Sequence, residues 1–185
     1  MNWLGYCRVG VLVPSLLWVA LVGGLLLLAP NAQADDFPEY RLKVAFLYNF
    51  SLFTEWPAEV GPTLQFCLQG TDPFGRDLDA LQGKPVGARS LQVQRKAGND
   101  SLKGCHIVFI AASALERLPR VLDEVRGLPV LLVADSPGAA GQGVMLNLSV
   151  AQNNKISFEA NLLAARTAHL QLSSKLLRLA TEVIQ

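Results

Sequence analysis

The sequence predicts a single α/β domain: a mainly parallel central sheet flanked by helices, with an antiparallel hairpin near the C-terminus. Short and almost continuous apolar runs at residues 105–111 and 129–134 are typical of strands that are covered on both faces. Helical periodicity separates these runs, and strands that alternate with helices build a parallel sheet. Two strand-like runs at residues 144–150 and 156–158 stand only a few residues apart and predict the hairpin.

The chain before the first apolar strand predicts one long helix. Within residues 39–53 the apolar side chains recur at spacings of three and four, which is the period of one helix face. They are Leu42, Phe46, Leu47, Phe50 and Phe53. Pro57 ends this helix, because the residue before a proline disfavours helical geometry. Residues 63–68 (TLQFCL) then form the first strand of the sheet.

The middle of the chain alternates between helix and strand signals. A turn at residues 70–73 leads into a short helix at residues 74–81, and residues 91–95 alternate as an edge strand does. Ser113 caps the next helix, and residues 136–143 form a glycine-rich loop. The buried stripe of that helix consists of Leu115, Leu118, Val121, Leu122 and Val125.

The last stretch predicts two helices separated by a brief strand. Asn161 is a favourable helix cap, and one short helix is expected at residues 162–169. Residues 170–172 read as the brief strand, after which Ser173 or Ser174 caps a final helix. Its apolar stripe is expected to reach almost to the end of the chain. The stripe consists of Leu176, Leu177, Ala180, Val183 and Ile184.

The first 34 residues predict a cleaved secretory signal. Residues 9–29 are almost wholly apolar, Arg8 is the only charge before them, and Ala32 and Ala34 supply the small residues of a signal-peptidase site. The alternative is an uncleaved inner-membrane anchor, since the apolar run is long enough to span a bilayer. We therefore expect residues 1–34 to be a signal peptide and residues 35–185 to form the exported domain.

The charges of the exported part are balanced. The chain carries 16 Lys and Arg against 15 Asp and Glu, and Arg8 is the only charge of the signal, so 15 positive and 15 negative residues remain. Nothing in this balance favours nucleic acid or an anionic membrane surface as a partner.

Two cysteines, Cys67 and Cys105, remain once Cys7 leaves with the signal. An even pair in an exported domain favours one disulfide. Both residues lie in strand-like segments, and neighbouring strands bring α-carbons within disulfide range. Two separate buried thiols are the alternative.

The sequence shows no catalytic constellation. It lacks the HExxH, GxSxG, CxxC and Walker motifs, and two scattered cysteines with two scattered histidines do not make a zinc site. His106 lies inside an apolar strand and is expected to be a core or strand-end residue, whereas His169 ends a helix and is expected to be solvated. We therefore predict no enzyme, no cofactor and no metal.

The loops after the strands offer a small-ligand site as an alternative function. Open α/β sheets bind ligands in the crevice at the carboxyl ends of their strands. Asp72 and Gly75 follow the first strand, Asp135 follows the 129–134 strand, and Gly138 lies in the glycine-rich loop. Asp72, Gly75 and Gly138 are the candidate ligand-binding residues, and the alternative is that these loops only connect the elements.

Aromatic residues near the N-terminal helix favour a protein partner instead. Apolar side chains cover most of the circumference of this helix, so some of them should face a second protein chain. Tryptophan and tyrosine are favoured in interface hot spots. The alternative is that Trp56, at the helix end beside Pro57, only locks the helix to the sheet. The candidate apolar anchors are Tyr48, Phe53 and Trp56, and the candidate polar contacts are Glu55, Arg166 and Arg178.

Several motifs resemble the YfiR family of periplasmic proteins. The run YRLKVAFLYNFSLFTEWP at residues 40–57 is similar to the N-terminal signature of that family, and residues 156–180 (ISFEANLLAARTAHLQLSSKLLRLA) are similar to its C-terminal signature. Between them DPFG at residues 72–75, GKPV at residues 83–86 and CHIVFIA at residues 105–111 follow in the same order. The resemblance covers nearly the whole exported part.

The resemblance implies a periplasmic repressor rather than an enzyme. Such proteins bind the periplasmic sensor domain of a membrane-bound diguanylate cyclase and keep cyclic di-GMP production, and with it biofilm formation, low. An OmpA-like outer-membrane lipoprotein sequesters the repressor. The resemblance also implies a homodimer and a disulfide, and Cys67 and Cys105 match a cysteine pair of the family, whereas a second pair found in some members is absent.

Overall fold

The computed structural model describes residues 39–151 and 153–185, so the predicted signal peptide, residues 1–34, lies outside the described residues. Eight strands form one sheet in the order β10-β8-β7-β6-β5-β2-β4-β3, and β1 pairs with β9 in a separate two-stranded sheet. The elements that make up these sheets and the layers around them follow in chain order. They are α2 (Glu39–Leu52), β1 (Thr54–Glu55), β2 (Thr63–Gln69), η2 (Gly75–Leu81), β3 (Pro85–Val86), β4 (Arg89–Lys96), β5 (Ile107–Ile110), η3 (Ala112–Arg117), α3 (Leu118–Glu124), β6 (Leu131–Ala134), η4 (Ala140–Gln142), β7 (Leu146–Val150), β8 (Ile156–Asn161), α4 (Leu162–Thr167), β9 (Gln171–Leu172), α5 (Ser174–Leu177) and β10 (Glu182–Ile184).

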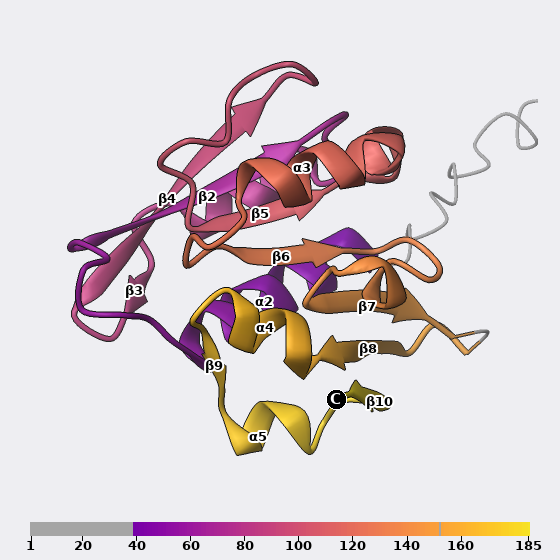
Figure 1. The fold of residues 1–185 in the computed structure, drawn as a ribbon. Helices are drawn as coiled ribbons and strands as arrows, with labels where there is room; N and C mark the ends of the chain where they lie inside the picture. Colours follow the sequence, from indigo (N-terminus) through magenta and orange to yellow (C-terminus); the bar gives the residue numbers. More distant parts are fainter. Residues whose placement is uncertain (1–38, 152) are drawn as a thin grey trace, which may run out of the picture. The chain divides into compact units, whose positions relative to one another are not determined.

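The topology of the large sheet confirms the predicted α/β class. Strand β2 pairs in parallel with both β4 and β5, β5 pairs in parallel with β6, and β6 with β7. Strands β7 and β8 form the antiparallel hairpin, with a register that runs from Leu146 opposite Ala160 to Val150 opposite Ile156. Helix α3 covers one face of the sheet and α2 the other (Figure 1).

Each central strand contributes to two cores because its side chains alternate between the two faces. In β5, Ile107 and Phe109 belong to the larger core beneath α2, whereas Val108 and Ile110 belong to the core beneath α3. This double burial explains why β5 and β6 appear in the sequence as continuous apolar runs rather than as alternating patterns.

The prediction that the apolar stripe forms one final helix almost to the end of the chain is wrong. Helix α5 ends at Leu177, and Glu182–Ile184 form β10, which pairs in parallel with β8. The pairing begins at Thr181, whose backbone N–H and hydroxyl both donate to the carbonyl oxygen of Phe158, at 2.9 and 3.0 Å. A strand satisfies the backbone groups along the outer edge of β8, which a helix at this place would leave unpaired. The sequence predicted that the hairpin forms an antiparallel edge of the sheet. Instead, β10 lies outside the hairpin and forms that border.

Two other predicted helices are tighter or shorter than their periodicity indicated. The predicted helix at residues 74–81 is the 3₁₀ helix η2. The helix that follows Ser113 begins as the 3₁₀ segment η3 and becomes α-helical at Leu118, with Pro119 in its first turn. Proline lacks the N–H that the interior of a helix requires, so it is tolerated at such a start.

The structure confirms the disulfide between Cys67 of β2 and Cys105, which lies just before β5. The two α-carbons are 5.9 Å apart, and both residues are buried in the core beneath α3. The bond links two neighbouring strands near the middle of the sheet.

His106 is a strand-end residue with a defined hydrogen bond, as expected. The backbone N–H of Gln65 donates to Nδ1 of His106 at 3.0 Å, and the backbone N–H of His106 donates to the Gln65 carbonyl oxygen at 2.9 Å. Because Nδ1 accepts a hydrogen bond, the ring is neutral with its proton on Nε2. Burial, followed by the positive charge of Arg89, lowers the pKa of His106 below its ordinary value.

We expect the stability of the protein to fall as the pH decreases below about 6.5. The unfolded chain binds a proton at His106 from that pH downward, whereas the folded chain binds it only at a lower pH, so acidification favours unfolding until the folded pKa is passed. The variant His106→Asn keeps an acceptor near the Nδ1 position but does not titrate. Urea titrations between pH 5 and 8 should show a flatter pH dependence for this variant; equal slopes for both proteins would contradict the assignment.

Candidate partner-binding surface

The strand pair β1–β9 joins the end of α2 to the segment between α4 and α5. Thr54 lies opposite Leu172, and Glu55 lies opposite Gln171. The Thr54 hydroxyl donates to the carbonyl oxygen of Phe50 at 2.7 Å, which holds the start of β1 against the last turn of α2. We call this strand pair and the side chains around its two hollows the β1–β9 ledge. Its lining residues are Glu55, Trp56, Pro57, Glu59, Pro129, Leu162, Arg166, His169, Leu170, Gln171, Leu172 and Leu177.

Side-chain caps fix the two short helices beside the ledge. The Asn161 side chain accepts a hydrogen bond from the Ala164 N–H at 2.8 Å and donates one to the Ala140 carbonyl oxygen at 2.8 Å, so it caps α4 and also ties it to η4. For α5 the cap is Ser173, whose hydroxyl accepts from the Leu176 N–H at 3.2 Å. Both helices are too short to persist alone, and these caps therefore contribute to holding the ledge in place.

One hollow of the ledge is acidic and aromatic. It has a volume of about 630 Å³ and is lined by Glu55, Glu59 and Trp56. The indole N–H of Trp56 donates to the carbonyl oxygen of Ser51 at 3.1 Å, so the half-buried ring has a fixed orientation. The exposed His169, which adopts the left-handed conformation with a φ of 56°, completes the wall.

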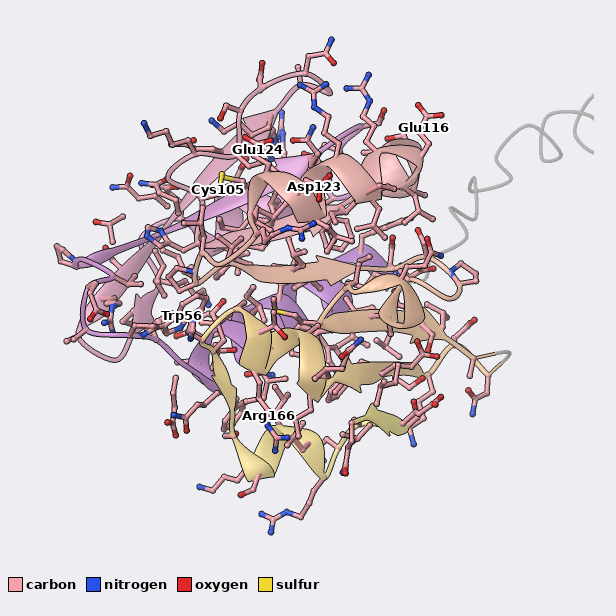
Figure 2. The ribbon with its side chains drawn as sticks, viewed as in Figure 1. Trp56, Cys105, Glu116, Asp123, Glu124 and Arg166 are labelled. Atoms are coloured by element: carbon pink, nitrogen blue, oxygen red, sulfur yellow. A yellow bond between two sulfur atoms is a disulfide. The ribbon has the colours of Figure 1, made fainter. Side chains whose placement is uncertain are left out.

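The other hollow of the ledge has the opposite charge. It has a volume of about 550 Å³, includes Arg166, and shares His169 and Gln171 with the first hollow. The exposed Lys175 adds a second positive charge on the neighbouring α5. Figure 2 shows Trp56 and Arg166 to either side of β9. Gln171 of β9 lines both hollows. The ledge is therefore acidic on one side and basic on the other.

The fold brings together three of the candidate contact residues. Glu55 and Trp56 line the first hollow and Arg166 lines the second, although α4 and β1 are far apart in the sequence. Arg178 is exposed directly after Leu177, which itself lines the second hollow. Their contact with a partner stays a prediction.

The two remaining candidates are held by contacts within the chain. The Tyr48 hydroxyl donates to the Pro85 carbonyl oxygen at 2.7 Å, and the Lys84 ammonium lies 5.0 Å from the centre of the Tyr48 ring. Phe53 packs against the larger core, and its carbonyl oxygen accepts the Ser173 N–H at 2.9 Å. Both side chains are half-buried, so they contribute to the fold whether or not they also reach a partner.

A separate crevice lies where β2, β5 and β6 end, at the edge of the sheet at which open α/β folds bind ligands. It has a volume of about 480 Å³. The Lys43 ammonium lies 2.7 Å from Asp135 Oδ2 and 2.5 Å from Glu39 Oε1, and 4.6 Å from the centre of the Tyr40 ring. Burial acts to lower the pKa of Lys43, but the hydrogen bonds and charges of the two carboxylates together outweigh it and raise the pKa.

The three candidate ligand-binding residues, Asp72, Gly75 and Gly138, shape the loops in which they lie. Asp72 accepts hydrogen bonds from the backbone N–H groups of Phe74 and Gly75 and pairs with Arg95 at 2.6 Å. Gly75 adopts a φ of 55° in this turn, and Gly138 adopts a φ of 76° in a different loop. The lining of the crevice includes the residues on either side of Asp72 but none of these three candidates. Ligand binding by them stays a prediction.

Lys43, His169 and Gln171 also belong to these sites but were not among the residues predicted from the sequence. A signal for Lys43 was present, because it falls at helical spacing with Leu47 and Phe50 on the buried stripe of α2. A charge in such a stripe requires a buried partner. No comparable signal exists for His169 and Gln171, whose place between the hollows depends on how β9 pairs with β1.

Comparison with known proteins adds the family. A family model described as YfiR/HmsC-like matches residues 40–181 of the chain. A search of curated proteins found no match to this chain. Within the described residues, no helix is long and apolar enough to cross a membrane, and no group of three or more metal-ligating side chains is placed to hold an ion.

Proposed function

Because this chain belongs to the YfiR/HmsC-like family, whose members are periplasmic and regulate diguanylate cyclases, we propose that it is a periplasmic repressor of a membrane-bound diguanylate cyclase. It binds the periplasmic domain of the cyclase, lowers the production of cyclic di-GMP and limits biofilm formation. The match over residues 40–181 is the observation that carries this proposal. In the same proposal residues 1–34 are a cleaved export signal, the repressor is a homodimer without catalytic activity, and an OmpA-like outer-membrane lipoprotein competes for it.

Repression of this kind is a shift between two states of the cyclase. A protein that binds both states equally shifts nothing, so the repressor must bind the inactive cyclase more tightly than the active one. A tenfold preference corresponds to about 1.4 kcal/mol of differential binding energy. No covalent chemistry is needed, which agrees with a sequence that lacks catalytic motifs.

The β1–β9 ledge has the properties of a surface that orients a partner. Trp56 presents a fixed aromatic side chain, and the flanking charges have opposite signs, with Glu55 on one side and Arg166 on the other. Aromatic anchors supply much of the binding energy of interfaces, and a dipolar arrangement of charges favours one orientation of the partner over the reverse. We therefore propose that the cyclase binds at this ledge.

Reversing the charge of Arg166 should weaken binding of the cyclase domain by about tenfold or more and raise cyclic di-GMP in cells. The side chain is exposed, so Arg166→Glu should leave the thermal unfolding midpoint within a few degrees of that of the unmodified protein. Binding is measured with the purified periplasmic domain, and cyclic di-GMP in a strain in which the variant replaces the native gene.

Arg120→Glu is the matched control, because Arg120 is also exposed but lies on α3, outside the lining of the ledge. Equal loss of binding in both variants would remove the ledge as the binding site. A deletion of the gene that leaves cyclic di-GMP and biofilm unchanged would remove repression itself.

The crevice beside Lys43 favours small-ligand sensing as a second candidate function. It lies at the carboxyl ends of parallel strands and combines a buried ion pair with the hydroxyl-bearing residues Thr71, Ser113 and Ser149. Calorimetry with amino acids and nucleotides tests this function, and the absence of heat at millimolar ligand would exclude these two classes.

A further inference from the structure

A further hollow lies between α3 and α4 and shares no lining residue with the ledge or with the crevice beside Lys43. It has a volume of about 460 Å³, which falls within the range of about 300–1,000 Å³ that small-molecule sites occupy. Figure 1 shows α3 and α4 on either side of β6, and Leu132 of β6 lies in the lining. The hollow is therefore a separate candidate site of the right size for a small molecule.

The wall of this hollow is apolar. Leu132 and Met145 are buried and form its inner end, whereas Leu163 is 59% exposed and lies at its mouth. An apolar ligand that covers this wall and displaces water from it gains binding energy in proportion to the apolar area removed from water. The wall consists of Leu122, Val125, Leu132, Met145, Leu163 and Ala164.

The polar side chains inside the hollow have partners within the chain. The Asn161 side chain accepts a hydrogen bond from the Ala164 N–H and donates one to the Ala140 carbonyl oxygen, both at 2.8 Å. The Thr167 hydroxyl donates to the Leu163 carbonyl oxygen at 2.9 Å. Among the described residues, no buried side-chain atom without a partner belongs to this lining. The body of a ligand must therefore be apolar, because a polar group there would lose its water without gaining a hydrogen bond.

Arg126 is the only charged residue among the described residues that line the hollow. Its guanidinium pairs with Asp123, and the two side chains are 77% and 70% exposed. An ion pair so open to solvent contributes little to stability, so the carboxylate of a ligand can replace Asp123 at small cost. A guanidinium offers two parallel N–H donors to such a carboxylate. The charge at this hollow therefore favours an anionic head group.

We propose that this hollow binds a fatty acid, with its hydrocarbon chain along the apolar wall and its carboxylate at Arg126. The chain is the apolar body that the interior requires, and the carboxylate is the anion that pairs with the exposed guanidinium. The site lies apart from the ledge, so the inference goes beyond repression of the cyclase and does not rest on it.

Calorimetry with decanoate, below the concentration at which it forms micelles, tests the binding itself. One decanoate should bind per chain. It should bind about tenfold more tightly than octanoate, because two more methylene groups are removed from water. The absence of binding at millimolar decanoate, or the binding of several molecules per chain without a distinct first site, overturns the proposal.

Arg126→Gln tests the role of the head group. This variant should bind octanoate about fivefold more weakly and should bind octanol, which has no charge, as the unmodified protein does. Asp123→Asn removes the competing carboxylate and should raise the affinity for octanoate. Arg120→Gln, at an exposed arginine of α3 outside the lining, is the control and should change neither affinity. An unchanged affinity for octanoate in Arg126→Gln, or an equal loss for octanol, overturns the assignment of a fatty acid.

Two pairs of variants test the location. Gly141 lines the hollow without a left-handed φ, and a Cβ at this position would meet no atom within 4 Å, so the side chain of Gly141→Leu has room at the hollow. Gly61→Leu meets the same two conditions outside the lining and is its control. Leu163→Ser removes the apolar mouth, and Leu179→Ser, at a leucine that is 69% exposed and outside the lining, is its control.

Gly141→Leu and Leu163→Ser should each weaken decanoate binding by about tenfold, because one fills the hollow and the other removes apolar wall. The two controls should bind decanoate as the unmodified protein does, and all four variants should keep their thermal unfolding midpoints within a few degrees. Decanoate that binds with unchanged affinity to both Gly141→Leu and Leu163→Ser lies elsewhere, and this result overturns the proposal.

Met145 gives a direct readout inside the hollow. The chain has two methionines, Met1 and Met145, so labelled methionine methyl groups give a simple spectrum. At saturating decanoate the Met145 methyl group should show nuclear Overhauser effects to the hydrocarbon chain, and their absence overturns the proposal. If decanoate fails to bind while Leu163→Ser weakens binding of the cyclase domain, a protein occupies the hollow and the fatty acid is excluded. The fatty-acid measurements use the purified protein alone, so their failure leaves repression of the cyclase untouched.

Discussion

Removing the Cys67–Cys105 disulfide should lower the free energy of unfolding by about 4 kcal/mol. The bond joins residues separated by 38 positions, and in the chain-entropy account a cross-link of this length restricts the unfolded chain strongly. Cys67 lies in β2 and Cys105 just before the neighbouring β5, and both are buried in the core beneath α3, so alanine at both positions keeps small apolar side chains in that core. This is a large part of the total stability of a typical domain.

The measurement is urea unfolding of the double variant Cys67→Ala/Cys105→Ala without reductant. Its unfolded state should be less compact, so the dependence of the unfolding free energy on urea should be steeper as well as the midpoint lower. Reduction of the unmodified protein should produce nearly the same loss, and reductant should not affect the variant. A variant as stable as the unmodified protein would show that the bond does not restrict the unfolded chain.

Replacing Asp135 with alanine should cost about 3–5 kcal/mol, which is the loss expected when one member of a buried ion pair is removed. Lys43 and Asp135 side chains are only 4% and 9% exposed, and they connect the first turns of α2 to the end of β6. Without Asp135 the Lys43 ammonium keeps only Glu39, whose side chain is 31% exposed. The variant loses stability because the buried Lys43 ammonium is no longer fully paired with carboxylates.

Two further variants separate the charge effect from lost packing. Glu39→Ala should cost only about 0.5 kcal/mol, since it removes an i,i+4 helix pair whose carboxylate is 31% exposed and leaves Lys43 paired with Asp135. Lys43→Met/Asp135→Leu removes both charges and should recover most of the stability lost in Asp135→Ala. Thermal and urea unfolding measure all three. A double variant as unstable as Asp135→Ala would show that packing, and not the unpaired charge, causes the loss.

The residue pattern predicted the central part of the fold well, because both faces of its strands are buried. Strands β5 and β6 contain only apolar residues, and all of them are buried. A strand without a polar face is buried in this way only in a sheet that is covered on both sides. The caps Asn161 and Ser173 were also predictable, since their side-chain oxygens accept N–H groups a few residues ahead. These are local interactions that neighbouring residues determine.

The candidate site was predictable only in part. Trp56 and Glu55 were named for their residue types, and Arg166 for its position on a helix, but nothing in the sequence placed them around one strand. Tyr48 has the same aromatic character as Trp56, yet its hydroxyl is bound to Pro85 on the β3 side. Composition identifies residues that are able to bind a partner, whereas pairing between distant segments decides which of them meet.

The sequence by itself determined the alternation of buried strands with helices and the helix caps, because these depend on residues that are close together in the chain. It also determined the family, because the family motifs occur in the same order along the chain. Only the tertiary structure decided that residues Glu182–Ile184 pair with β8 and that Lys43 meets Asp135. Val183 and Ile184 fit the face of a helix or a strand equally by their spacing. The backbone groups along the outer edge of β8 required hydrogen-bond partners, and that requirement arose only once the hairpin had formed.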